Sequence, residues 1–397
     1  MSKHAPAWSQ DPAVRQVIAA LAAAGGEGRF VGGCVRDSLL GREIKDIDIA
    51  TPLQPDAVMA ALKLAGLSAI PTGLKHGTVT AVVDHQPIEI TTLREDLETD
   101  GRHARVGFTT DWRRDAQRRD LTMNALFLDC EGQLYDFVDG KADLEAGRVR
   151  FVGDPRLRIQ EDFLRILRFF RFHAHYGRGD PDGPALQAAE DLAPGLRQIS
   201  GERKAQEMLR LLRATDPLPV LRTMDDRGIL DYVLPKSGGC GRLERLLQEV
   251  PESDAVQRLA ALVSPGGGQE TARALKLSKR QSRRLNAMTE PAGGGLAEPL
   301  ARRRLLYFHG PEALLDRART AVAAEAIAPS LMAAIDAEVA AWQPKALPIT
   351  GGDLLALGLE GPAIGQMMRA LEAWWIEANF QPDHDALLAE VKRRLSL

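Results

Sequence analysis

Two aspartates, Asp46 and Asp48, stand one residue apart in "DIDIAT" (46–51), a β-like run of the chain. Residues two apart on a strand point to the same face, so the two carboxylates should share a patch while Ile47 and Ile49 face the interior. Such close like charges repel and raise each other's pKa, and a divalent cation bound by oxygen ligands relieves the repulsion. The pair therefore predicts a magnesium site or, as the simpler interpretation of so short a motif, two solvated acids at a strand end.

Two glycines and an arginine precede the acidic pair. Gly32 and Gly33 follow an apolar run, and the sequence "VRDSLLG" (35–41) predicts a short helix directly after them. Backbone N–H groups at a helix start attract anions, and Arg36 could hold the same anion from its side chain. A tight turn would explain the glycines alone. Together with the acidic pair that follows, they predict a cradle for a triphosphate.

A third carboxylate, Glu89, lies in "PIEITTL" (87–93), where Ile88 and Ile90 would point to the opposite face of a strand. Glu89 could deprotonate or polarise an attacking hydroxyl group, or complete a metal shell. The alternative is a cross-strand salt bridge.

The sequence "EDFLRILRFFRF" (161–172) predicts an amphipathic helix with charged residues on much of its surface. Its apolar arc consists of Phe163, Ile166, Leu167 and Phe170. Asp162 and Arg165 are three residues apart, so they would be neighbours on the helix surface.

A hydrogen-bond acceptor beside a donor matches the edges of cytosine and adenine, because each of these bases has an amino donor next to a ring acceptor. Uracil and guanine present the reverse pattern, which would leave buried groups unpaired. Asp162 and Arg165 therefore predict selection of CTP and ATP without a nucleic-acid template. The alternative is a solvated salt bridge between them, worth only about 0.3 kcal/mol.

The surrounding elements predict an α+β class with a helical remainder. Runs rich in β-branched residues predict strands at "RFVGG" (29–33), "DIDIAT" (46–51), "TVTAVVD" (78–84) and "PIEITTL" (87–93). Between them, "PDAVMAALKLAG" (55–66) predicts a helix that ends at Gly66. From about residue 141 onward, amphipathic helices separated by Gly and Pro dominate the sequence.

Length and composition indicate a globular protein of more than one domain, with 397 residues, 45% hydrophobic and 26% charged. No apolar run approaches the roughly 20 residues that span a bilayer, and a signal peptide is not evident, so we expect a cytoplasmic protein with no membrane partner. The three widely spaced cysteines predict neither a disulfide framework nor a zinc site. Since the net charge is −3, any polyanion should be bound locally, by the arginines of 113–120 and 156–172.

Several of these segments, in this order along the chain, resemble the bacterial class II tRNA nucleotidyltransferase and poly(A) polymerase family. The resemblance is continuous over 30–172 and is carried by "GGCVRDSLLGREIKDIDIAT", "IEITTLRED", "DGRHARVGFT", "RRDLTMNAL", "YDFVDGKADLEAGRVRFVGDP" and "QEDFLRILRFFRF". A weaker match follows at "ISGERKAQEMLRLL" (199–212), and "PITGGDLLALGLEGPAIGQMM" (348–368) is similar to the tail of CCA-adding members.

The resemblance implies a polymerase-β-like nucleotidyltransferase head (1–140), a helical neck with a base-reading helix (141–200), and a helical body and tail that bind tRNA (201–397). It implies that Asp46 and Asp48 bind Mg²⁺ and that Glu89 is the third carboxylate. The residues that match nucleotide-binding positions of the family are Gly33, Arg36, Arg119, Asp162, Arg165, Arg168 and Arg171.

The implied activity is CCA addition to the 3′ end of tRNA from CTP and ATP, with release of pyrophosphate and with no DNA partner. In the family a mobile segment follows the third carboxylate, and here 94–108, with Gly101 and no apolar periodicity, predicts a flexible loop. Its presence favours full CCA addition over A-only addition to tRNA, and poly(A) synthesis is the second alternative. A poly(A) polymerase would also be expected to have a more basic terminal extension than "EVKRRLSL".

Overall fold

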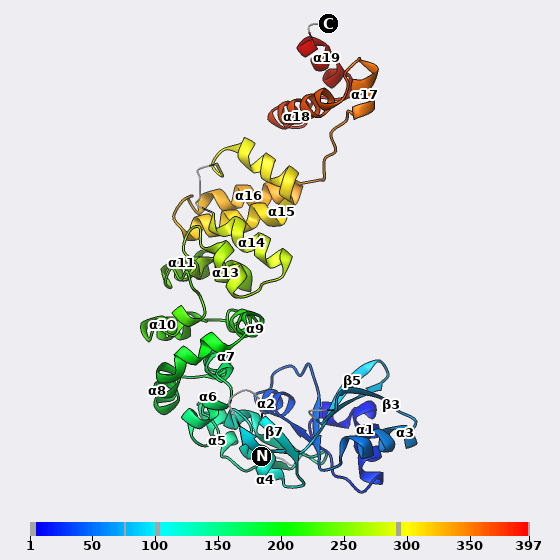
Figure 1. The fold of residues 1–397 in the computed structure, drawn as a ribbon, viewed down its shortest axis with the longest axis vertical. Helices are drawn as coiled ribbons and strands as arrows, with labels where there is room; N and C mark the ends of the chain where they lie inside the picture. The colour runs from blue at the N-terminus through cyan, green and yellow to red at the C-terminus, as the bar shows by residue number, and fades with distance from the viewer. Residues whose placement is uncertain (1–4, 75–76, 100–103, 291–294, 396–397) are drawn as a thin grey trace. The chain divides into compact units, whose positions relative to one another are not determined.

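The computed structural model describes residues 5–74, 77–99, 104–290 and 295–395. The chain forms two compact units, Met1–Val233 and Leu234–Leu397 (Figure 1). All β-strands of the described residues belong to the first unit, and the helical second unit follows it in sequence. The predicted α+β class with a helical remainder is confirmed.

The first unit contains a mixed sheet of seven strands in the order β3-β4-β5-β2-β1-β8-β9. The strands are β1 (Arg29–Val31), β2 (Asp48–Thr51), β3 (Ser68–Gly73), β4 (Thr78–Val83), β5 (Gln86–Thr92), β8 (Leu126–Leu128) and β9 (Leu134–Asp136). Strands β2 and β5 are parallel and adjacent, and their register pairs Asp48 with Glu89. Two of the predicted carboxylates therefore lie side by side, Asp48 at the start of β2 and Glu89 in the middle of β5.

Alternation along the central strands explains this placement. Ile49 and Ile90 are fully buried, whereas Glu89 is exposed, as expected when successive side chains of a strand point to opposite faces. Helix α3 (Pro55–Leu64) packs on β3, β4 and β5, and α1 (Pro12–Ala23) packs on α3 (Figure 1).

The described parts of the segment 94–108 are two paired strands instead of the expected flexible loop. Strands β6 (Arg94–Thr99) and β7 (Ala104–Phe108) pair antiparallel, with an irregular register near Asp96. Residues 100–103, which include Gly101, lie outside the described residues. The prediction missed these strands because charged residues hide the strand pattern of "REDLET".

The other helices of the first unit carry or flank most of the remaining site residues. They are η1 (Ala7–Gln10), α2 (Gly33–Leu39), α4 (Trp112–Gln117), η3 (Thr122–Asn124), α5 (Gly140–Ala146), α6 (Pro155–Glu161), α7 (Leu164–Tyr176), α8 (Gly183–Leu192), η4 (Ala193–Gln198), α9 (Gly201–Leu211), α10 (Leu218–Asp226) and η5 (Leu230–Tyr232). Helices α7 and α9 pack against each other. The predicted single helix over 161–172 is wrong, because Asp162 is extended (φ −158°, ψ 106°) and separates α6 from α7.

The second unit is helical, and apolar clusters pack between its helices. Its helices are α11 (Gly241–Glu249), α12 (Ala255–Leu262), α13 (Gly268–Ala274), α14 (Lys279–Thr289), α15 (Pro299–Ala323), α16 (Ser330–Ala341), α17 (Gly351–Ala356), α18 (Pro362–Glu377) and α19 (His384–Leu395). One cluster lies around Leu314 and Ile335, and another around Trp375 and Val391. Across the described chain, every helix is too short or too polar to cross a membrane.

Candidate active site

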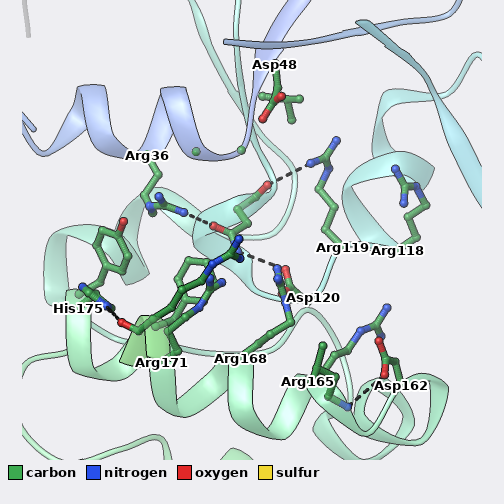
Figure 2. Close-up of a pocket in the computed structure, with 18 of the residues that line it drawn as sticks. Arg36, Asp48, Arg118, Arg119, Asp120, Asp162, Arg165, Arg168, Arg171 and His175 are labelled. Carbon is green, nitrogen blue, oxygen red and sulfur yellow. Dashed lines mark hydrogen bonds and ion pairs between the residues drawn. The ribbon is translucent and has the colours of Figure 1, made fainter. Parts of the chain in front are cut away.

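A pocket with a cavity volume of about 900 Å³ lies within the first unit (Figure 2). This volume is at the upper end for ligand sites. Nine of the ten residues predicted as site residues line it: Gly33, Arg36, Asp48, Glu89, Arg119, Asp162, Arg165, Arg168 and Arg171. Predicted site residues that are up to 138 positions apart in the sequence thus line one pocket, whose wall contains carboxylates and many arginines.

Asp48 and Glu89 form the acidic side of the pocket. Burial of Asp48, together with the charges of Glu89 and Asp46, raises its pKa to about 6, although Arg119 acts in the opposite direction. The prediction that Asp46 and Asp48 share one face of a strand is wrong, because β2 begins only at Asp48. Asp46 is exposed and is not among the residues that line the pocket. The negative charge of Asp46 nevertheless contributes to the raised pKa of Asp48.

The fit of a divalent cation can be judged from these carboxylates. Within the described residues, no three His, Cys, Asp or Glu side chains are grouped to hold a metal ion. Magnesium is usually bound through one or two carboxylates together with substrate phosphates and water, so a complete protein cage is not required. Burial of Asp48 and the nearby charges of Glu89 and Asp46 raise its pKa, and a divalent cation would stabilise the ionised form of such a carboxylate. The oxygen ligands present therefore fit such an ion.

Asp48→Asn is expected to stabilise the metal-free protein at neutral pH. The raised pKa means that, between about pH 4 and about pH 6, the folded protein binds more protons than the unfolded chain, so stability falls as pH rises through this window. Two pKa units correspond to at most about 3 kcal/mol. The measurement is the midpoint temperature of thermal unfolding in a buffer that contains a metal chelator. At pH 8 this midpoint should be higher for Asp48→Asn than for wild type, and the difference should vanish near pH 4.

The matched control for this measurement is Asp84→Asn. Asp84 is an exposed residue in the turn between β4 and β5 and has φ 47°, a conformation that asparagine tolerates. The Asp84→Asn substitution should leave the midpoint of thermal unfolding unchanged at both pH values. An unchanged or lowered midpoint for Asp48→Asn at pH 8 would contradict the assigned electrostatics.

The glycine pair and Arg36 lie beside this acidic edge. Gly32 has φ 74°, a left-handed conformation that favours glycine, and it joins β1 to α2. A Cβ on Gly33 would lie 3.8 Å from Arg36 Nη2, so the absence of side chains keeps the space beside the guanidinium open. The predicted strand, glycine turn and helix are all present.

Arg36 is held in place from several sides. Its Nε and Nη2 donate to the two carboxylate oxygens of Asp37 at 3.0 and 2.8 Å, and its Nη1 donates to Asn124 Oδ1 at 2.7 Å. Its guanidinium carbon also lies 4.3 Å from the ring centroid of Tyr176, whose hydroxyl donates to Asp37 at 3.0 Å. Arg36 is therefore pre-oriented before any ligand binds, which reduces the entropy lost on binding.

A chain of polar contacts extends from Arg36 to helix α7. Asn124 Nδ2 donates to Asp120 Oδ1 at 3.2 Å, and Arg168 Nε donates to Asp120 Oδ2 at 2.6 Å (Figure 2). Burial of Asp120 favours its neutral form, but the Arg168 guanidinium holds the pKa of this carboxyl below its usual range. The four side chains, Arg36, Asn124, Asp120 and Arg168, are called the polar chain below. They join the glycine turn to the predicted base-reading helix.

Arg119 is oriented by a buried carboxylate. Its Nε and Nη2 donate to Asp115 Oδ2 at 3.1 and 2.9 Å, and Arg118 pairs with the other oxygen of Asp115 at 2.7 Å. Burial of Asp115 opposes its ionisation, but Arg119 and Arg118 hold its pKa below the usual range. Asp115 thus fixes both arginines along the pocket wall.

The predicted base-reading residues lie at the break between α6 and α7, where Figure 2 shows Asp162 and Arg165 close together. Asp162 Oδ1 accepts a hydrogen bond from the Leu164 N–H at 3.1 Å, and Asp162 Oδ2 accepts one from Arg203 Nη2 at 2.6 Å. Arg165 Nη1 instead pairs with Glu161 and donates to the Arg158 carbonyl at 2.9 Å. The alternative interpretation, a salt bridge between Asp162 and Arg165, is therefore not what the structure shows.

Arg171 lies deeper in the same wall. Burial lowers its pKa to about 10, although its partner Glu207, at 3.0 Å on α9, acts in the opposite direction. At neutral pH Arg171 remains a cation, and it is only weakly solvated. Such a cation binds phosphate more strongly than an exposed one.

Several pocket residues were not predicted. Asp120 and Asn124 are part of the quoted "RRDLTMNAL", so the spacing of polar residues in that segment could have pointed to them. Tyr176 and the α9 residues Arg203 and Arg210 also line the pocket. Tyr176 is the last residue of α7, beyond the analysed segment 161–172. Arg203 and Arg210 lie in the quoted segment 199–212, but only the packing of α9 on α7 brings them to the pocket.

Family models match the chain in two places. Residues 28–150 match the poly A polymerase head domain, and residues 183–237 match a model described as a probable RNA and SrmB-binding site of polymerase A.

Relatives match over nearly the whole chain. It is 34% identical over 386 residues to the mitochondrial CCA tRNA nucleotidyltransferase 1 of Danio rerio, covering 92% of this chain and 87% of the relative. It is 33% identical over 390 residues to the CCA-adding enzyme of Streptococcus gordonii, covering 95% and 96%. The crystal structure of the Bacillus stearothermophilus CCA-adding enzyme in complex with CTP matches with a TM-score of 0.77 at 27% identity, covering 97% of this chain and 99% of that chain.

Proposed function

Because the chain belongs to the family of CCA-adding tRNA nucleotidyltransferases, we propose that it adds C, C and A to the 3′ end of tRNA. CTP and ATP are the substrates, pyrophosphate is released, and no nucleic-acid template is needed. The observation that carries this proposal is the single pocket that gathers two carboxylates, the arginines and the Asp162–Arg165 pair (Figure 2). A nucleoside triphosphate needs all three: an acidic metal edge, cations for its phosphates, and a polar pair for its base.

The acidic edge is proposed to hold Mg²⁺ through Asp48, with Asp46 and Glu89 beside it. When bound, the ion supplies charge neutralisation at the phosphates and at the reacting oxygens. Glu89 faces the pocket from an exposed position on β5. Its carboxylate is suited to accept the proton of the ribose hydroxyl that attacks the α-phosphate.

The arginines are proposed to bind the triphosphate and ribose. Arg36 and Arg119 are fixed by Asp37, Asn124 and Asp115, so both guanidinium groups are held at the pocket before a nucleotide binds. Most of the rate acceleration in phosphoryl transfer comes from such positioning and from electrostatic stabilisation.

The base is proposed to be read by Asp162 and Arg165. Both oxygens of Asp162 already accept a hydrogen bond, but a carboxylate has about four lone-pair sites and can accept a further one from the amino group of cytosine or adenine. Arg165 has five donors, of which Nη1 is engaged by Glu161 and the Arg158 carbonyl. The other donors remain for a ring acceptor of the base.

The three-part division into a head (1–140), a neck (141–200), and a body and tail (201–397) remains a proposal, as does RNA binding by the helices after residue 200. The match of 183–237 to an RNA-binding family model supports it. Contacts of arginines with RNA phosphates should weaken as salt rises. The cytoplasmic location stays a prediction.

The experiment that tests the function uses tRNA that lacks its 3′ CCA. The protein is incubated with this tRNA, Mg²⁺, and CTP, ATP or both, and the products are sequenced. The proposal expects CC with CTP alone and CCA with both nucleotides. Long adenosine tails would show a poly(A) polymerase instead, and addition of a single A only to tRNA that already ends in CC would show an A-adding enzyme.

A further inference from the structure

We propose that Arg203 is a positioning residue for nucleotide selection, acting by fixing the carboxylate of Asp162. This inference rests on the proposed function, in which Asp162 reads the base. Arg203 belongs to α9, whereas Asp162 links α6 to α7 and Arg165 belongs to α7.

The geometry of Asp162 carries the inference. Its residue is the extended link between α6 and α7, with φ −158° and ψ 106°. Two contacts hold its carboxylate, one from the next helix in sequence and one from a distant helix: the N–H of Leu164 donates to Oδ1 at 3.1 Å, and Nη2 of Arg203 donates to Oδ2 at 2.6 Å. The first contact is local and leaves rotation about the carboxylate, whereas the second comes from a separate helix. Only the two together define the plane of the carboxylate.

That plane decides which base fits. Arg165 is held independently by Glu161 and the Arg158 carbonyl, so its donors keep their place when Asp162 turns. The acceptor of Asp162 must lie at the spacing of an amino group next to a ring nitrogen. A carboxylate that rotates loses this match, and the pocket then discriminates less between cytosine and uracil.

The contact between Arg203 and Asp162 contributes little to stability. Their side chains are 49% and 30% exposed, and such surface pairs are worth about 0 to 1 kcal/mol. Arg227 and Glu190 form a comparable pair at 2.7 Å with exposures of 43% and 34%, and neither residue lines the pocket. Arg227→Ala is therefore a matched control that removes the same kind of ion pair from the same unit.

The test compares Arg203→Ala, Arg203→Lys and Arg227→Ala in the full-length protein. For each, kcat and KM are measured with CTP and with UTP on tRNA lacking its CCA. Arg203→Ala should lower the CTP-over-UTP ratio of kcat/KM by about 10- to 100-fold, because small misplacements of a positioned group cost this much. Arg203→Lys keeps a cation for Asp162 and should retain more of the ratio than Arg203→Ala. Arg227→Ala should keep the wild-type ratio.

Two outcomes would overturn the inference. If Arg203→Ala raises KM equally for CTP and UTP, Arg203 binds the nucleotide in a way common to both bases and does not position Asp162. If the ratio is unchanged, the contact has no role in selection. Both outcomes leave CCA addition by the wild-type protein intact, so they are distinguishable from failure of the proposed function. A variant with both Asp162→Ala and Arg203→Ala should be no less selective than Asp162→Ala alone, since Arg203 acts through Asp162.

Discussion

Asp48→Asn is expected to reduce nucleotide incorporation by about a thousandfold or more. Asp48 lines the pocket, pairs in register with Glu89, and is proposed to hold the metal ion. Asparagine keeps the shape of the side chain but removes the charge that binds a divalent cation. Without the cation, the negative charge that develops on the reacting phosphate in the transition state is no longer stabilised. Single-turnover incorporation of radiolabelled CMP into tRNA lacking its CCA measures the effect.

The same variant is expected to be more stable than wild type when metal is absent, so loss of activity could not be ascribed to misfolding. Opposite changes in stability and activity are common at sites that carry unbalanced charges. Asp84→Asn, which makes the same substitution in the turn between β4 and β5, outside the pocket, should retain wild-type incorporation. Incorporation by Asp48→Asn within tenfold of wild type would remove Asp48 from the proposed mechanism.

Asp162→Ala is expected to abolish the preference for CTP over UTP, with a loss of about 100- to 10,000-fold in the ratio of kcat/KM. Alanine removes the acceptor that meets the amino group of cytosine, and it also leaves Arg203 without its partner at 2.6 Å. Sequencing of products made with all four nucleotides would show whether U and G enter the 3′ end.

Glu190→Ala is the matched control for this variant. Glu190 also pairs with one arginine, Arg227 at 2.7 Å, but it lies outside the pocket. It should leave the product sequence unchanged. Faithful CCA addition by Asp162→Ala would show that the base is read elsewhere.

The sheet and its acidic edge could be predicted because their signals are local. Alternation along "DIDIAT" and "PIEITTL" placed Ile49 and Ile90 inside, and Asp48 and Glu89 on the pocket side. The same rule failed for Asp46, because alternation holds only within a strand and β2 begins two residues later. The positions of strand ends are set by pairing with neighbouring strands, which a single segment does not reveal.

The base-reading region shows a different limit. Asp162 and Arg165 both line the pocket, but not as neighbours on one helix, and the break between α6 and α7 has no proline or glycine to indicate it. Its partner Arg203 lies 41 residues further along the chain. Contacts over such separations depend on how helices pack, and periodicity within one helix contains no information about them.

The polar chain from Arg36 to Arg168 also limits how this protein can change over evolutionary time. Asp120 is buried between Asn124 and Arg168, so a lineage that replaced one member would leave a charge or an amide without its counterpart. Drift at these positions should therefore proceed through paired replacements, or not at all. The exposed pair of Arg227 and Glu190 faces no such restriction, and either residue is free to vary alone.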